Sequence, residues 1–168
     1  MGVIGAIIMG FFGAVFAALT LAFPLHWAGP AIALPFVVFA PILIAALVIL
    51  HKNGTAYPLS PVARKTIMWS STAEGVGIFL AANIVINIGH PEWLLPAIAL
   101  VVGLHFIPIA YAAALPFFYA LAMLLICAAA TGVVLGGVLG AAMAGFTAAI
   151  ALWLAALLAL MRDYRAKS

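Results

Sequence analysis

Charged side chains are scarce in this sequence: of its 168 residues, six are Lys or Arg and three are Asp or Glu. The chain is 5% charged and 70% hydrophobic, whereas a soluble domain is about 25% charged and about 45–50% apolar. So few charges could not cover the surface of a soluble globule, and intrinsic disorder requires the opposite bias in composition. The composition therefore predicts an integral membrane protein with almost no mass outside the bilayer.

Cysteine is almost absent too, and so are the short motifs that mark catalytic and cofactor sites. The single cysteine, Cys127, excludes a disulfide within the chain. The sequence contains no P-loop, nucleophile elbow, H-E-x-x-H motif or dinucleotide fingerprint. His26, His90 and Glu92 lie outside the apolar runs, but their spacing matches no metal-binding motif. We therefore predict no cofactor and no metal site. An intramembrane enzyme stays open as the third and least favoured class of function.

Long apolar runs are what the sequence has in abundance. A transmembrane helix needs about 20 consecutive apolar residues, and six runs meet this requirement. They predict an all-α, six-span transmembrane bundle in a single domain over residues 1–168. The expected spans are 3–23, 30–50, 67–88, 93–111, 114–133 and 138–161, with a cytoplasmic loop at 51–66. The boundary between the last two spans is the weakest, and one long re-entrant feature over 112–161 is the alternative.

The basic residues predict an orientation in the membrane. All of them lie either between the second and third runs or after the sixth: Lys52, Arg64, Lys65, Arg162, Arg165 and Lys167. If both termini are inside, every one of them lies on the cytoplasmic side, as the positive-inside rule requires. Trp27 and Trp93 then lie at the outer interface, where tryptophan anchors helices.

A short pattern recurs where the second and fourth runs begin. Trp-x-x-Pro-Ala-Ile-Ala-Leu occurs at 27–34 and again at 93–100, with a histidine just upstream of each copy. The recurrence suggests helical hairpins related by a parallel repeat, and repeats are common in transporters. Chance similarity between apolar segments is the alternative, and we give the two equal weight.

Two ionisable residues fall within the expected spans, where such groups are costly and mark functional sites by default. Glu74 lies in the third span and His105 in the fourth, each ~9–10 Å from the inner interface at ~1.5 Å per residue. A tight turn joins these spans, so they should be antiparallel neighbours, and the two side chains are expected to meet. A carboxylate and an imidazole in contact form a proton-handling pair. The alternative is a buried pair that only fixes helix register.

Thr72, Asn83, Asn87 and His90 form a polar stripe along the third expected span. At about 100° per residue these four residues share one side of a helix. Asn83 and Glu74 point to opposite faces, so this span is polar on two sides. It is therefore either central in the bundle or in contact with another subunit. The stripe either lines a path or makes hydrogen bonds between helices.

Part of the chain resembles families of small bacterial membrane proteins to which no activity is assigned. The resemblance rests on EGVGI at 74–78, Asn83 and Asn87, GHPE at 89–92 and VGLHFIP at 102–108, and it covers the third to fifth expected spans. It implies a bacterial inner (plasma) membrane. It also singles out Glu74 and His105, although it transfers no function.

Two functions from different classes fit these observations. The first is a small transporter or channel for a proton, an ion or a small solute, with Glu74 and His105 as its titratable pair. The second is a non-transporting membrane component, such as an assembly factor, an accessory subunit or a lipid-binding scaffold. The expected partners are the lipid bilayer and either a second copy of the chain or another membrane protein, and we expect no nucleic acid.

Overall fold

The computed structural model describes residues 2–52 and 60–167 of the chain. Within these residues the protein forms six α-helices and two short 3₁₀-helices, without a strand. The predicted all-α fold is thus confirmed. Six helical segments in the described part of the chain are long and apolar enough to cross a membrane, which makes the chain an integral membrane protein. The elements are α1 (Val3–Ala22), η1 (Gly29–Ala33), α2 (Leu34–His51), α3 (Pro61–Asn87), η2 (Pro91–Trp93), α4 (Leu94–Ala113), α5 (Phe117–Leu135) and α6 (Gly137–Ala166).

Helix α3 begins six residues earlier than its apolar run, at Pro61 rather than at residue 67. The cause is a capping arrangement, because the Ser60 hydroxyl accepts a hydrogen bond from the backbone N–H of Ala63 at 3.1 Å. Proline suits the first turn of a helix, where its missing N–H costs nothing. The expected loop at 51–66 is therefore shortened by α3, which takes in 61–66, and residues 53–59 of it lie outside the described residues.

The chain turns sharply between α4 and α5 and again between α5 and α6. Ala114 ends α4 in the left-handed conformation, with φ 52°. Gly136, between α5 and α6, and Gly137, the first residue of α6, have φ values of 63° and 54°, a region that glycine enters without a steric penalty. Helices α5 and α6 pack side by side. Each of them is long and apolar enough to cross a membrane by itself, which favours two spans over one re-entrant feature across 112–161.

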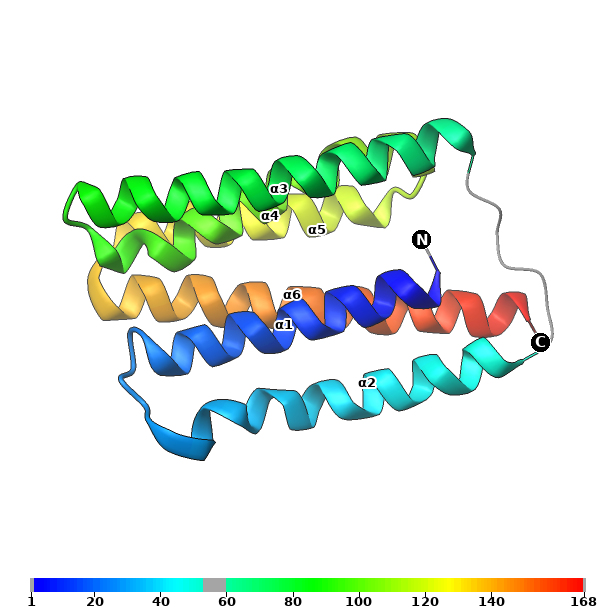
Figure 1. The fold of residues 1–168 in the computed structure, drawn as a ribbon, viewed down its shortest axis with the longest axis horizontal. Helices are drawn as coiled ribbons and strands as arrows, with labels where there is room; N and C mark the ends of the chain where they lie inside the picture. Colours follow the sequence, from blue (N-terminus) through cyan, green and yellow to red (C-terminus); the bar gives the residue numbers. More distant parts are fainter. Residues whose placement is uncertain (1, 53–59, 168) are drawn as a thin grey trace.

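Helices α1 and α6 form the centre of the bundle, and α2 and α3 lie on opposite sides of it (Figure 1). Helix α2 packs on α1 and α6, while α4 and α5 pack on the other side of α6. Helix α3 packs mainly on α4 and on the short η2. Only two of its residues are buried, Ala63 and Val85. The interpretation that α3 is central in the bundle is therefore wrong.

Small residues allow the central helices to approach closely. A Cβ atom on Gly13 of α1 would lie 2.7 Å from the Trp153 ring of α6. The indole N–H of Trp153 donates a hydrogen bond to the carbonyl oxygen of Gly10 at 3.1 Å. A Cβ atom on Gly132 of α5 would lie 2.8 Å from the Ala144 side chain of α6. Backbone contact of this kind is how membrane helices pack in the absence of a hydrophobic force between them.

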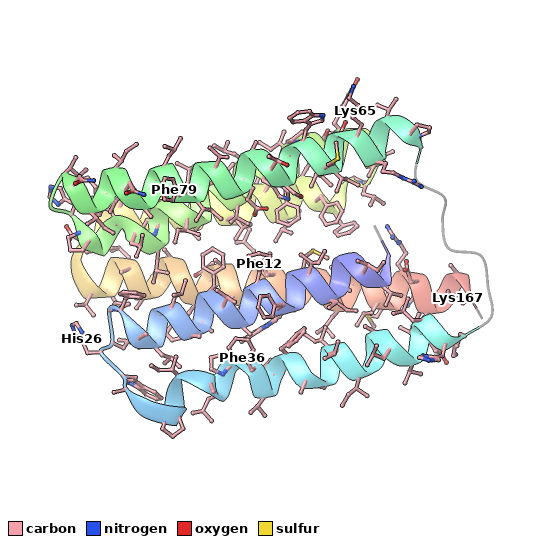
Figure 2. The ribbon with its side chains drawn as sticks, in the orientation of Figure 1. Phe12, His26, Phe36, Lys65, Phe79 and Lys167 are labelled. Atoms are coloured by element: carbon pink, nitrogen blue, oxygen red, sulfur yellow. The ribbon has the colours of Figure 1, made fainter. Side chains whose placement is uncertain are left out.

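The two ends of the bundle differ in charge, and Lys65 and Lys167 both lie toward the same end (Figure 2). The basic residues all lie at one end, where α2 and α6 finish and α3 begins. The Lys167 ammonium there donates hydrogen bonds to the carbonyl oxygens of Ile49 and Lys52, at 2.9 and 3.2 Å. This end is called the cationic end below. Trp27 follows the C-terminal end of α1, and Trp93 directly precedes α4. Both therefore lie near the end of the bundle opposite to the cationic end.

Candidate functional site

A tight turn between α3 and α4 brings their midpoints to the same level. Gly89 lies in this turn with φ 79°, and the N–H of His90 donates to the Val85 carbonyl at 3.1 Å, as in a helix terminated by a left-handed glycine. Glu74 precedes Gly89 by 15 residues (89 − 74) and His105 follows it by 16 (105 − 89). The two side chains therefore lie at nearly equal distances from the turn, on adjacent antiparallel helices.

Glu74 and His105 lie together at the seam between α3 and α4. Glu74 Oε2 is 3.6 Å from His105 Nδ1, which is an ion-pair distance if both groups are charged but longer than a hydrogen bond. The side chains are only 15% and 7% exposed, respectively. The meeting of these two residues, inferred from their positions in the sequence, is therefore present in the structure.

A third residue, Ser70, holds the His105 side of the pair. The Ser70 hydroxyl donates a hydrogen bond to the backbone carbonyl oxygen of His105 at 3.0 Å, and its oxygen lies 3.1 Å from His105 Nδ1. When the hydroxyl proton is committed to the carbonyl, the Ser70 oxygen is free to accept a hydrogen bond from Nδ1–H. The ring nitrogen that faces Glu74 is therefore also the one that Ser70 orients.

Close approach of the two helices supports this arrangement. A Cβ atom on Gly77 would lie 2.9 Å from the Val101 side chain of α4, so only glycine fits here without a shift of Val101. Gly77 is one turn of α3 away from Glu74, on the side of the opposite end. Glycine at this position lets α3 and α4 come close enough for the carboxylate to reach the imidazole.

Two grooves meet at the Glu74–His105 pair. The first, the α3–α4 groove, has a volume of about 750 Å³ and extends along both helices toward the cationic end; its lining includes Lys65, Trp69, Ser70, Glu74 and His105. The second, the α1–α3 groove, has a volume of about 520 Å³ and lies among α1, α3, α4 and α6; its lining includes Phe12, Ser71, Glu74, Gly75 and His105. Both grooves are otherwise mostly apolar, and the pair forms part of the wall of each.

The polar stripe on α3 is separate from this site. Thr72, Asn83 and Asn87 are exposed, and each donates a hydrogen bond to a carbonyl of its own helix, those of Met68, Phe79 and Asn83 at 3.0, 2.7 and 2.8 Å. None of the three residues lines either groove. Among the described residues, none of them makes a side-chain hydrogen bond to another helix of this chain.

The remaining member of the stripe, His90, belongs to the opposite end of the bundle. Its Nδ1 lies 2.9 Å from Glu92 Oε1, and its ring stacks on Trp93 with 4.2 Å between centroids. These contacts order the turn before α4, and they include Trp93, one of the two residues expected to anchor that end. Trp27, the other expected anchor, is 46% exposed.

Comparison of the chain with protein-family models, with curated proteins and with solved structures found no match. The resemblance to small bacterial membrane proteins therefore stays a prediction. What can be said about function comes from the geometry of the chain itself.

The chemistry available at the site is that of a single carboxylate–imidazole pair in apolar surroundings. A net charge on such a pair is costly in a membrane. The pair is neutral in two forms, as carboxylate with imidazolium and as carboxylic acid with neutral imidazole. A proton can therefore change places between Glu74 and His105 without creating net charge.

Proposed function

We propose that the protein is a small transporter that moves a proton, or a small solute together with a proton, and that Glu74 and His105 are its titratable pair. One observation carries this proposal. The two side chains approach to 3.6 Å at a wall that two separate grooves share. A pair that served only to fix helix register would not need two grooves that both reach it.

The grooves supply different surroundings for the same pair. The α3–α4 groove extends to Lys65 at the cationic end, which gives it a route toward water. The α1–α3 groove includes residues of α1 and Leu152 of α6 and so reaches into the centre of the bundle. In this proposal a proton passes from one groove to the other through the pair.

The loose packing of α3 supports movement at this site. Helix α3 packs mainly on α4, whereas α1 and α6 carry most of the buried core. A small shift of α3 against α4 would change the access of the pair without disturbing the core of the bundle. Rocking of one part of a bundle against another is a common way for transporters to alternate access.

The test is proton flux into lipid vesicles that contain the purified protein and an entrapped pH-sensitive dye, driven by a potassium diffusion potential. We expect flux above that of empty vesicles. We expect Glu74→Gln to lower it by roughly 100-fold, the lower end of what a positioned proton-transfer group contributes. His105→Ala should have a comparable effect.

Two matched variants control for loss of charge or of a ring elsewhere in the chain. Glu92→Gln removes a half-buried carboxylate at the opposite end, and His51→Ala removes an exposed imidazole whose Nδ1 lies 2.8 Å from the Leu47 carbonyl oxygen. Both should keep full flux. Undiminished flux in Glu74→Gln and His105→Ala would refute the mechanism. Absence of flux in the unaltered protein would favour a non-transporting membrane component.

A further inference from the structure

We propose that two copies of the chain associate through the face of α3 that points away from α4. The residues of this face are spaced alternately by three and four positions and are all exposed: Trp69, Thr72, Val76, Phe79, Asn83 and Ile86. This set is called the outer seam. The proposal is independent of the proposed function, because it rests on residues that take no part in the Glu74–His105 contact.

The outer seam is opposite to the face of α3 that the bundle uses. Glu74 and Asn83 are nine positions apart, which at about 100° per residue places them on opposite sides of the helix. Helix α3 meets the rest of the chain mainly through α4, at the edge of the bundle (Figure 1). Lys65, at the cationic end of this outer side, projects away from the bundle (Figure 2). The outer seam is therefore uncovered in a single copy.

Asn83 makes this exposed face unsuitable for lipid. About 20 helical residues cross the hydrocarbon layer of a bilayer. If this stretch of α3 begins at the charged Lys65, it ends near residue 85, so Asn83 lies within the hydrocarbon layer. One N–H of its amide donates to the Phe79 carbonyl at 2.7 Å. Its side-chain oxygen and second N–H have no partner among the described residues. Polar groups inside a bilayer require hydrogen-bond partners, and another helix can supply them.

A second copy of the same chain satisfies the amide by symmetry. The basic residues all lie at one end of the bundle, so two copies inserted by the positive-inside rule point the same way. In such a parallel pair, residues of a seam with alternating spacings of three and four meet their own counterparts. Asn83 then faces Asn83 of the second copy. A carboxamide is both donor and acceptor, and is thus complementary to itself.

The paired arrangement also affects the α3–α4 groove. Trp69 is 14 positions before Asn83 (83 − 69), which places it at one margin of the outer seam at about 100° per residue, and it also lines this groove. A second copy seated on the seam would therefore lie beside the open side of the groove and cover part of it. The Glu74–His105 pair, which lines the same groove, would then be shielded further from lipid.

Disulfide cross-linking in lipid vesicles tests this interface with two closely matched positions. Ile86 and Ile84 are 59% and 58% exposed and lie two positions apart in the sequence, but only Ile86 belongs to the outer seam. Cys127 is itself exposed, so every variant in this experiment also carries Cys127→Ser. We expect Ile86→Cys to form a covalent dimer on oxidation and Ile84→Cys to stay monomeric. Equal cross-linking of the two, or none at Ile86, would overturn the proposal.

The second arm measures the dimer fraction by single-molecule photobleaching across a range of protein-to-lipid ratios. Asn83→Leu should weaken dimerisation by about 3- to 30-fold, as expected for the loss of hydrogen bonds between helices. Thr131→Val is the control, because Thr131 is exposed on α5 and bonds only to its own helix. An unchanged dimer fraction in Asn83→Leu, or a monomer at every ratio, would contradict the proposed seam. Leucine is more apolar than asparagine, so this variant leaves the fold intact.

Discussion

The carboxylate of Glu74 and the imidazole of His105 lie 3.6 Å apart, although 31 positions separate them in the sequence (105 − 74). The contact exists because the turn at Gly89 folds α4 back along α3, and because Gly77 lets the two helices approach closely. Both grooves that reach the pair follow from the same geometry, since they lie on the two sides of the contact between α3 and α4. The following predictions test the parts of this arrangement one at a time.

Ser70→Ala should lower proton flux without unfolding the protein. The Ser70 hydroxyl holds the ring nitrogen of His105 that faces Glu74, so its loss leaves the ring free to turn away. The expected decrease is about fivefold, corresponding to one hydrogen bond of about 1 kcal/mol. The control is Thr131→Val, because the Thr131 hydroxyl bonds only to carbonyl oxygens of its own helix and lines neither groove. Equal flux in the two variants would show that Ser70 does not position His105.

Gly75→Leu should block flux and leave thermal stability unchanged or slightly higher. Gly75 lines the α1–α3 groove, and a Cβ atom there would meet nothing within 4 Å. A leucine side chain would therefore enter the groove, while removal of glycine favours the helix by up to about 1 kcal/mol. Flux and the melting temperature in detergent are the two readouts. Full flux in this variant would mean that the α1–α3 groove is not part of the path.

Gly132→Ala should destabilise the bundle, in contrast to Gly75→Ala. A Cβ atom on Gly132 would lie 2.8 Å from Ala144 and 2.9 Å from the carbonyl oxygen of Gly140, so α5 and α6 would have to move apart. Overpacking of this kind costs about 1–3 kcal/mol. The measurement is thermal unfolding of both variants in the same detergent. A melting temperature of Gly132→Ala equal to that of Gly75→Ala would contradict the close packing of α5 on α6.

Ala73→Cys should react with a water-soluble maleimide in vesicles once Cys127 has been replaced by Ser. Ala73 lines the α3–α4 groove, which we propose to be the route from water to the pair. Ile84→Cys is exposed but lines neither groove, so it should react only with a lipid-soluble reagent. If both cysteines resisted the water-soluble reagent, the groove would be dry and a purely structural role of the pair would be favoured.

Much of the fold follows from the sequence because the physical requirement is simple. About 20 apolar residues are needed to cross a bilayer, and six runs of this length correspond to the six long helices. The Glu74–His105 contact was also predictable, from the depth of each residue and the tight turn between their helices. The early start of α3 had a signal in the sequence as well, the pair Ser60-Pro61, which is typical of a helix N-terminus.

Other features could not be predicted from the pattern of residues. Helix α3 is polar on two sides, and this pattern fits both a central helix and one that meets another subunit. The packing of α1 on α6, elements far apart in the sequence, excludes the central position by leaving α3 at the edge of the bundle. Ser70 was missed, although it lies one turn before Glu74 on the same face. Serine is common enough in membrane helices that spacing alone gave no reason to select it.

The central claim is that Glu74 and His105 act as one unit in proton transport, and a double-mutant cycle of flux tests it most directly. Flux is measured in the same vesicles for the unaltered protein, Glu74→Gln, His105→Ala and the double variant. Groups that act together are strongly non-additive. The account predicts that the double variant loses no more flux than the worse of the two single variants. Losses that multiply, or a double variant with full flux, would contradict it.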